Sequence, residues 1–573
     1  MDVRITLPAV LTALFLTWKL FQLARNKRLA RQTGLPYALS PIHELETLAF
    51  FTDVLLRCYC QKHLMRGQGW PNWARFMVKN WHYEDKGRAH REYGAVFLVV
   101  STGGIICYSA DADVSLGMVV KRRAFVKMRA LMKMLEVFGP NVVSTNGELW
   151  RDHIRITLPS FGEQVQNLVW DETTRQTDML CQSWARSGKI GIKESIYQLT
   201  MNTMSLASFG WSVDWTSGQD CIPAGHRMSL VEALTKVISH LPSILLLPRF
   251  LLPILPGRTA HIACSEFETY MDELIASESR LLAEGGSGEL RRETLLTALL
   301  RARRESVAES QSQGSASFSL TDQEIKGNIF IFLLAGYDTT ANTMIYTCMV
   351  LAIYQDIQDK ARQEVDSIYA RISGSDHQEL SYSKHFHDLR YLLAVMYEVM
   401  RVFPTVLPIT RETESAQQVA MPAGGHSGEN GTKAFLPAGT ITVVNITGTH
   451  YSETNWPSPH IIEPRRWLSQ DPNKFDPLNP PPSHGEEAVS IPGHKKGTFM
   501  TFNEGPRACL GRNFARAEFL AFFSRLLRKY RLELDKGVSG AALEWTLRCS
   551  SGGSPVTLTP PHDIKLRLVP REK

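Results

Sequence analysis

The sequence has no disulfide framework. Its nine cysteines are odd in number and lack the regular spacing of a disulfide-rich domain. Disulfide-stapled secreted scaffolds are therefore excluded, and a reducing compartment is expected. The cysteines are Cys58, Cys60, Cys107, Cys181, Cys221, Cys264, Cys348, Cys509 and Cys549.

A strong charge of one sign is also missing. The formal net charge is +6 over 573 residues, and no basic stripe interleaved with aromatic residues occurs, so we expect no nucleic-acid partner. No G-x-G-x-x-G run follows a strand in a βαβ unit, so the chain has no flavin or nicotinamide signature. A hydrophobic content of 44% over this length predicts one large folded unit.

The first long apolar run lies at the N-terminus. Residues 5–24 are mostly apolar, with Lys19 as their one charged residue, and twenty residues can cross a bilayer as a helix. Basic residues follow the run, which predicts that the rest of the chain is cytosolic. They are Arg25, Lys27, Arg28 and Arg31. We predict a transmembrane anchor in residues 1–33 and a catalytic domain in residues 34–573, with a cleaved signal peptide as the competing interpretation.

Three other segments suggest local structure. Residues 241–256 are apolar but contain four prolines, so they form either a buried connector or a loop that dips into the same membrane. Residues 305–319 are rich in Ser, Gln and Gly and predict an exposed linker, and residues 476–496 predict an inserted loop. Thr321 and Glu324 have the spacing of a capping box, which predicts the start of a long buried helix.

The most informative run is Phe502-Asn503-Glu504-Gly505-Pro506-Arg507-Ala508-Cys509-Leu510-Gly511. Its two glycines allow a tight turn and close approach of the backbone to a flat partner. Apolar residues recur at helical spacing after Gly511, so Cys509 is expected at a helix start, where backbone N–H groups favour a thiolate. Arg507 places a fixed positive charge nearby. The competing interpretation is a buried structural cysteine.

This run resembles the haem-binding loop of the cytochrome P-450 family, F-x-x-G-x-R-x-C-x-G, at every fixed position. The resemblance implies that Cys509 is the axial thiolate ligand of a haem iron. It also implies that Arg507 pairs with a haem propionate and that Phe502 packs beside the haem and shields the sulfur. A thiolate ligand pushes electron density onto the iron and favours O–O cleavage.

A second motif lies inside the predicted buried helix. The run Ala335-Gly336-Tyr337-Asp338-Thr339-Thr340 places polar side chains where they need partners. It resembles the oxygen-activation motif of the same family. By that resemblance Gly336 opens a groove at the haem, Thr339 holds water by hydrogen bonds, and Asp338 relays protons from solvent. The competing interpretation is a polar patch satisfied by hydrogen bonds within the helix.

Further residues match structural elements of the family. Glu398 and Arg401 are spaced to share one helix face, and with Arg466 they resemble its E-x-x-R and P-x-R-[FW] elements, which implies a buried charged network. Arg411 resembles a residue that reaches a haem propionate from a strand, and Trp150 resembles one that donates its indole N–H there.

One position departs from the family pattern. The pattern W-x-x-x-[RH] has a basic residue at its last position, where this chain has Ile154. His153 or Arg155 could replace the missing charge, and the identity of the replacement stays open.

Together these motifs predict a mainly α fold with small β-sheets (α+β), as in the cytochrome P-450 fold, and a single large catalytic domain. The function they imply is a haem-thiolate monooxygenase that hydroxylates or epoxidises a lipophilic small molecule. The implied partner is a separate diflavin NADPH–cytochrome reductase, and the implied location is the endoplasmic reticulum membrane. The inserted loop is similar to that of fungal members, which suggests secondary-metabolite biosynthesis. The alternatives are a haem-thiolate isomerase or dehydratase that acts without O2, and a haem-based sensor.

Overall fold

The structure is a computed structural model. It describes residues 3–187, 191–212, 215, 222–241, 244, 252–253, 258–283, 294–313, 319–372, 379–420, 433–469, 471, 473–478, 494–549, 557–560 and 565–571. Most of the apolar segment 241–256 and of the insertion 476–496 lies outside these residues, so neither expectation is tested.

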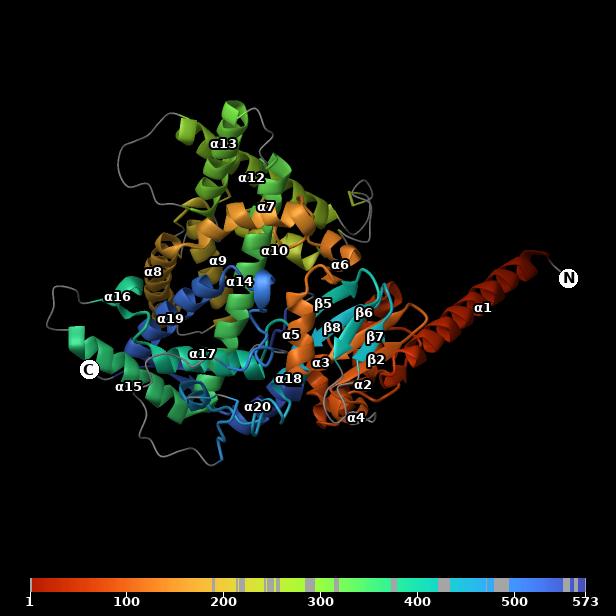
Figure 1. The fold of residues 1–573 in the computed structure, drawn as a ribbon. Helices are drawn as coiled ribbons and strands as arrows, with labels where there is room; N and C mark the ends of the chain where they lie inside the picture. Colours follow the sequence, from red (N-terminus) through yellow and green to blue (C-terminus); the bar gives the residue numbers. More distant parts are fainter. Residues whose placement is uncertain are drawn as a thin grey trace.

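Helices dominate the fold, and most of the long ones gather on one side of the molecule, away from the large sheet (Figure 1). The long helices are α1 (Val3–Gln32), α2 (Thr47–Met65), α7 (Gly147–Thr157), α8 (Glu163–Ser187), α9 (Ile192–Phe209), α10 (Leu230–Ser239), α12 (Arg258–Ala283), α13 (Leu295–Gln313), α14 (Asp322–Ile353), α15 (Gln355–Ile372), α17 (Arg390–Val402), α19 (Arg512–Lys529) and α20 (Gly540–Cys549). The short ones are η1 (Arg75–Met77), α3 (His82–Asp85), α4 (Arg88–Tyr93), α5 (Ala112–Val120), α6 (Arg129–Lys133), η2 (Leu158–Phe161), α16 (Tyr382–His385), α18 (Ile446–His450), η3 (Pro464–Leu468) and η4 (Gly505–Arg507).

The strands form one six-stranded sheet and two small hairpin-like pairs among the described residues. The large sheet has the order β1-β2-β3-β8-β5-β4, and the small sheets pair β6 with β7 and β9 with β10. The strands are β1 (Tyr37–Leu39), β2 (Val96–Val100), β3 (Ile105–Ser109), β4 (Phe125–Val126), β5 (Pro408–Thr413), β6 (Gln417–Ala420), β7 (Lys433–Leu436), β8 (Ile441–Asn445), β9 (Tyr530–Leu534) and β10 (Leu566–Pro570). The prediction of a mainly α fold with small sheets is confirmed.

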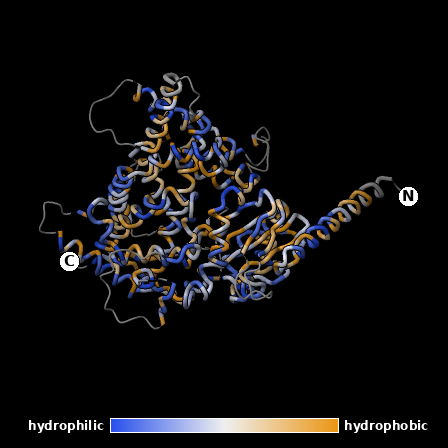
Figure 2. The backbone as a smooth tube through the Cα atoms, viewed as in Figure 1, coloured by the Kyte–Doolittle hydropathy of each residue, from blue (hydrophilic) through white to orange (hydrophobic). Residues whose placement is uncertain are grey.

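Both faces of the large sheet are covered. Alternate residues of β2 and β3 point to opposite faces: Val96 and Leu98 pack in one apolar cluster, and Phe97 and Val99 pack in another. Residues of α1 and α5 belong to the first cluster, and Cys60 and Leu64 of α2 belong to the second. Figure 2 shows the hydrophobic stretches of the sheet enclosed in this way. Because both faces are dry, every residue of β2 and β3 is buried.

Helix α14 is the axis of the helical part, and it packs against α9, α13, α15, α17 and α19. It begins where the sequence predicted: Thr321 is its N-cap, and Thr321 and Glu324 form a complete capping box. The helix is buried around most of its circumference. It therefore holds a fixed position against its neighbours, as a helix that carries chemistry must.

Two predictions about the chain's organisation are corrected. Among the residues that the structure describes, no helix is both long and apolar enough to span a bilayer, so the predicted transmembrane anchor is not supported. In α1, Thr12, Thr17, Lys19 and Gln22 interrupt the apolar residues. The predicted linker 305–319 is helical as far as Gln313, because α13 extends from a buried start that packs against α12 and α14.

Candidate active site

The loop that carries Cys509 is closed by its own backbone. The amide of Cys509 donates to the Phe502 carbonyl at 2.8 Å, and Asn503 Nδ2 donates to the Arg507 carbonyl at 3.0 Å. Gly505 has a φ of +70°, and a Cβ there would lie 3.0 Å from Val120 Cγ2, so the turn requires glycine at this position.

The second glycine of the loop does not need a backbone conformation that only glycine adopts. Gly511 has an ordinary φ of −82° and is the N-cap of α19. Its amide interacts with the Cys509 thiol and lowers the thiol pKa, as does the positive charge of Arg512. Burial has the larger effect and raises that pKa above its usual value.

Cys509 is nevertheless an exposed residue by its accessible surface. Surrounding protein desolvates the thiol even though the residue keeps accessible surface. The ring of Phe502, the first residue of the loop, lies 6.5 Å from the Tyr397 ring and 5.8 Å from the Arg512 guanidinium. Cys509 is thus held just before the start of α19 and remains accessible.

A second accessible surface occurs in the middle of α14. Ala335 is exposed and Thr339 is partly exposed, although Leu334 and Asp338 beside them are buried. Thr339 Oγ1 donates to the Ala335 carbonyl at 2.6 Å. Helix α14 packs against α19, which follows Cys509. This stretch of α14 therefore offers a hydroxyl oxygen to accessible space.

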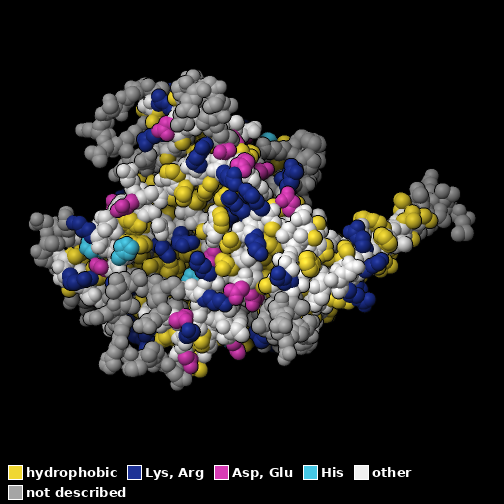
Figure 3. Space-filling view, viewed as in Figure 1, with side chains coloured by type: hydrophobic (Ala, Val, Ile, Leu, Met, Phe, Trp, Pro, Cys, Tyr) yellow, Lys and Arg dark blue, Asp and Glu magenta, His cyan; other side chains and the backbone are white. Residues whose placement is uncertain are grey.

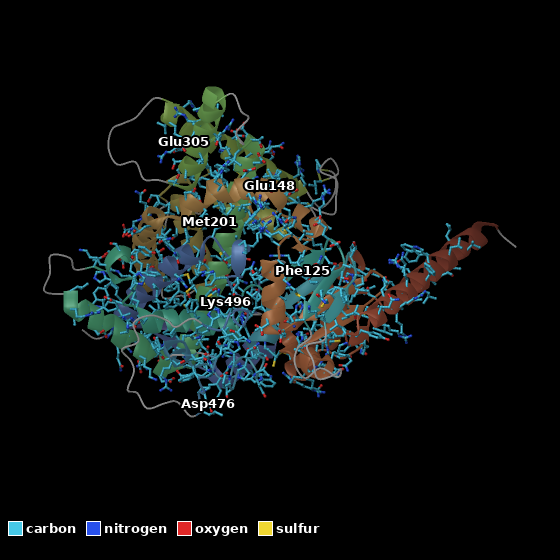
Figure 4. All side chains as sticks on the ribbon, viewed as in Figure 1. Phe125, Glu148, Met201, Glu305, Asp476 and Lys496 are labelled. Carbon is cyan, nitrogen blue, oxygen red and sulfur yellow. The ribbon has the colours of Figure 1, made fainter. Side chains whose placement is uncertain are left out.

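The Cβ side of Gly336 faces α9, not open space. A Cβ on Gly336 would lie 2.8 Å from Met204 Sδ on α9. The glycine allows α14 and α9 to approach closely, so the prediction that it opens a groove at the haem is wrong. Figure 4 labels Met201, which lies on α9 as Met204 does, beside α14 in the centre of the helical part.

The Asp338 carboxylate is buried and points toward α9 and the C-terminal segment. Its Oδ1 accepts from Tyr197 Oη at 3.1 Å and from Asn342 Nδ2 at 3.1 Å, and its Oδ2 accepts from Thr557 Oγ1 at 2.5 Å. Burial raises the pKa of Asp338, and the bonds from Thr557, Tyr197 and Asn342 oppose that effect. No hydrogen bond joins Asp338 to the Thr339 side chain in the described part of the chain, so the two adjacent residues face different surroundings.

Arg507 and Arg411 have no acidic partner in the described part of the chain, and Arg507 lies against Trp150. The Arg507 guanidinium lies 4.0 Å from the centre of the Trp150 ring and donates to the Thr145 carbonyl at 2.9 Å. Burial, followed by the positive charges of Arg411 and Arg122, lowers the pKa of Arg507 to about 9. Burial lowers the pKa of Arg411 to about 10, and its one hydrogen bond among the described residues goes to the Thr410 carbonyl at 2.8 Å.

Neither neighbour of Ile154 replaces the missing charge. His153 is buried, with Nε2 3.3 Å from Glu324 Oε1 and Nδ1 3.0 Å from Asn328 Nδ2, so it joins α7 to the start of α14. Arg155 is exposed and pairs with Asp152 at 3.6 Å. Ile154 packs against the apolar core of the helical part.

The three residues of the predicted charged network meet. Arg401 donates two hydrogen bonds to the Glu398 carboxylate, at 2.8 and 2.9 Å, and Arg466 Nε lies 3.7 Å from the same carboxylate. Trp467 Nε1 donates to Glu398 at 3.0 Å. Burial raises the pKa of Glu398, but Arg401 and Arg466 outweigh it and hold that pKa below its usual value.

Comparisons with known proteins agree with this geometry. The sequence model of the family described as Cytochrome P450 matches residues 72–546. The cytochrome P450 monooxygenase prx9 of Penicillium rubens is 35% identical over 97% of this chain and 96% of its own length.

The chain belongs to the cytochrome P450 family. The cytochrome P450 monooxygenase ORF6 of Penicillium roqueforti is 35% identical over 97% of this P450. A phomenoic acid biosynthesis cluster cytochrome P450 monooxygenase of Leptosphaeria maculans is 24% identical over 88%. The crystal structure of a cytochrome P450DA heme domain aligns with a TM-score of 0.64 at 18% identity, covering 86% of this chain and 93% of that one, and confirms the fold.

A P450 of this kind is a monooxygenase that holds haem through a cysteine thiolate, uses O2 and receives electrons from a reductase. The residues present fit that cofactor. Cys509 is an accessible cysteine, and in the described part of the chain Arg411 and Arg507 have no carboxylate to balance their charges. The Trp150 indole N–H has no protein acceptor there either. A buried and a partly buried cation without counter-ions call for an anionic ligand, and the haem propionates supply one.

The sequence motifs did not predict several residues of this P450 site. Tyr197 and Thr557 hold Asp338 from positions 141 and 219 residues away, and no local pattern indicates them. Trp467 bonds to Glu398, and its place in the matched P-x-R-[FW] element could have predicted it.

Proposed function

We propose that this P450 inserts one oxygen atom from O2 into a lipophilic small molecule, by hydroxylation or epoxidation, in fungal secondary metabolism. The observation that carries this proposal is the accessible stretch of α14, where Thr339 offers a hydroxyl beside the buried carboxylate of Asp338. The exposed side chain of Ala335 on this stretch is apolar, which favours an apolar substrate. The similar protein from a phomenoic acid cluster supports the metabolic setting.

In this proposal Cys509 binds the haem iron, and Trp150, Arg411 and Arg507 hold the propionates. When bound, the haem supplies the iron that activates O2. Phe502, packed between Tyr397 and Arg512, shields the sulfur. Glu398, Arg401 and Arg466 fix the segments before the Cys509 loop. The catalytic domain spans residues 34–573.

The residues on α14 move protons. Thr339 donates its hydroxyl proton to the Ala335 carbonyl, so its oxygen lone pairs are available to accept from water. Asp338, whose pKa is raised by burial, binds a proton more readily than an exposed carboxylate does. Tyr197 and Thr557 donate hydrogen bonds to the Asp338 carboxylate. We propose that protons enter past these two hydroxyl groups and reach Thr339 by way of Asp338.

Two other functions make different predictions. A haem-thiolate isomerase or dehydratase consumes neither O2 nor NADPH and has no need of Asp338 and Thr339. A haem-based sensor binds its ligand without turnover. The accessible hydroxyl of Thr339 favours the monooxygenase, because proton delivery is needed only when O2 is cleaved.

The test is turnover of the haem-loaded protein with a diflavin reductase, NADPH, labelled O2 and candidate lipophilic substrates. The proposal predicts one labelled oxygen atom per product molecule. Thr339→Ala should keep NADPH consumption but lose most of the product. The matched control is Thr343→Ala, because Thr343 makes the same type of bond, 2.9 Å to the Thr339 carbonyl, from a buried position. Product formed without labelled oxygen would establish the isomerase or dehydratase instead.

The reductase should dock on the face around the Cys509 loop. Arg512 and Arg516 follow this loop, and their positive charges attract an acidic partner. Arg516 contributes the smaller part of this attraction, because its guanidinium bonds to the Tyr397 hydroxyl and burial lowers its pKa to about 10. Arg512 remains partly exposed at the start of α19.

The proposed location is the endoplasmic reticulum membrane, with the catalytic domain in the cytosol. Two helices present apolar side chains to solvent. On α1 these are Val10, Leu11, Leu14, Phe15, Leu16, Trp18, Leu20 and Phe21, and on α2 they are Leu48, Phe51, Val54, Leu55 and Tyr59. Figure 3 shows the apolar surface of α1, with basic side chains closer to the body of the protein. Cell fractionation tests this proposal: recovery of the full chain with soluble proteins would contradict it.

A further inference from the structure

The family pattern leaves one cofactor contact unassigned, because Ile154 stands where a basic residue is usual and neither His153 nor Arg155 can replace it. The replacement must come from another part of the chain that reaches the same place. Two independent observations indicate that Lys127, between β4 and α6, is this residue.

The first observation is the register of β4 and β5. These strands pair antiparallel, with Phe125 opposite Thr413 and Val126 opposite Glu412. The next step of that register sets Lys127 opposite Arg411. Figure 4 labels Phe125 where the sheet meets the helical part. Lys127 is therefore beside the residue that the motifs assign to a propionate.

The second observation is the turn that precedes α7. Lys127 Nζ donates to the Val143 carbonyl. Arg507 donates to the Val142 carbonyl at 3.4 Å and to the Thr145 carbonyl at 2.9 Å. The ammonium and the guanidinium thus contact one short segment, and that segment leads directly to Trp150.

The charges at this place are unbalanced. Arg122 lies 4.7 Å from the centre of the Trp150 ring, and Arg507 lies 4.0 Å from it. In the part of the chain that the structure describes, no carboxylate pairs with Arg122, Lys127, Arg411 or Arg507. Burial lowers the pKa of Lys127 well below its usual value, and the charges of Arg507 and Arg411 lower it further. The negative charge of an anionic ligand opposes both effects, because it favours the charged form of the ammonium.

We propose that Lys127 supplies the cation that position 154 lacks, and that its ammonium binds a haem propionate together with Arg411 and Arg507. This inference rests on the proposed propionate contacts of those two arginines. Lys127 is a cofactor-binding residue in this account, and it takes no part in oxygen chemistry.

Haem retention tests the proposal directly. The haem-loaded full chain is mixed with excess apomyoglobin, and the rate of haem transfer is followed by absorbance. Lys127→Gln should transfer haem roughly ten- to a hundredfold faster than the unchanged protein, the range expected for one charge-assisted hydrogen bond. Lys127→Arg should retain haem, and the reduction potential of Lys127→Gln should shift to more negative values because a nearby positive charge is lost. The matched control is Lys133→Gln, at an exposed lysine of α6.

A second variant separates cofactor binding from folding. Adding Ile154→Arg to Lys127→Gln returns a cation by the route the family pattern uses, and it should restore slow haem transfer. Failure of this rescue, with Lys127→Gln destabilised in its haem-free form, would overturn the proposal in favour of a structural role through Val143. If Arg411→Gln and Arg507→Gln accelerate transfer and Lys127→Gln does not, Lys127 is not the replacement. If none of the three accelerates transfer, the proposed propionate contacts themselves are wrong.

Discussion

Replacing Glu398 by glutamine removes the one negative charge of a fully buried network. Glu398, Arg401 and Arg466 have no accessible surface. Glutamine keeps the shape of the side chain but leaves two guanidinium groups without a counter-ion. Breaking a buried ion pair on one side costs about 3–5 kcal/mol. We therefore expect Glu398→Gln to lower the free energy of unfolding by about that amount.

The assay is urea denaturation of the haem-loaded protein, followed by tryptophan fluorescence and by the haem absorbance. Two variants calibrate it. Trp467→Phe removes one hydrogen bond to the same carboxylate, at 3.0 Å, and should cost about 1.5–3 kcal/mol. Asp388→Asn breaks the exposed pair with Arg371, at 3.4 Å, and should cost less than about 1 kcal/mol. The reasoning is refuted if Glu398→Gln costs no more than Asp388→Asn.

Three further predictions address pH and backbone geometry. Burial raises the pKa of Glu364 from 4.5 to about 7, so the folded state binds the proton more tightly and loses roughly 3 kcal/mol of stability as pH rises from 4.5 through 7. Glu364→Gln should flatten the dependence of the free energy of unfolding on pH, measured by denaturation curves. An unchanged dependence would contradict the assignment. Tyr197→Phe removes a hydrogen bond that lowers the pKa of Asp338, so the pH profile of coupled product formation should move to higher pH, and an unmoved profile would exclude Tyr197 from the relay. Gly505→Ala forces a non-glycine residue to a φ of +70° and should lower the free energy of unfolding by about 1–2 kcal/mol, with loss of bound haem. The control Gly117→Ala, where a Cβ meets no atom within 4 Å, should be neutral or stabilising. Equal effects of the two substitutions would show that the loop tolerates a side chain.

The parts of this protein that the sequence could predict are local. The capping box at Thr321 depends on four consecutive residues, and the Cys509 loop depends on ten. Glu398 and Arg401 are one helical turn apart. In each case the side chains that interact are also close along the chain, so pattern and geometry coincide.

The parts it could not predict depend on long-range contacts. Gly336 has the same sequence context whether it lines a groove or packs on Met204, and only the position of α9 decides between them. The segment after Glu305 is rich in linker residues, but α13 continues into it as far as Gln313 because its first turns are buried. The four cations of this region, Arg122, Lys127, Arg411 and Arg507, come from the segments on either side of β4, from β5 and from the Cys509 loop, and no single motif joins these segments.

The central claim is that Cys509 is the thiolate ligand of the haem iron. The most direct measurement is the absorbance spectrum of the reduced carbon monoxide complex of Cys509→His, compared with that of the unchanged protein. The account predicts that the unchanged protein gives the red-shifted band typical of thiolate ligation and that the variant loses it. Survival of that band in the variant would show that another residue ligates the iron.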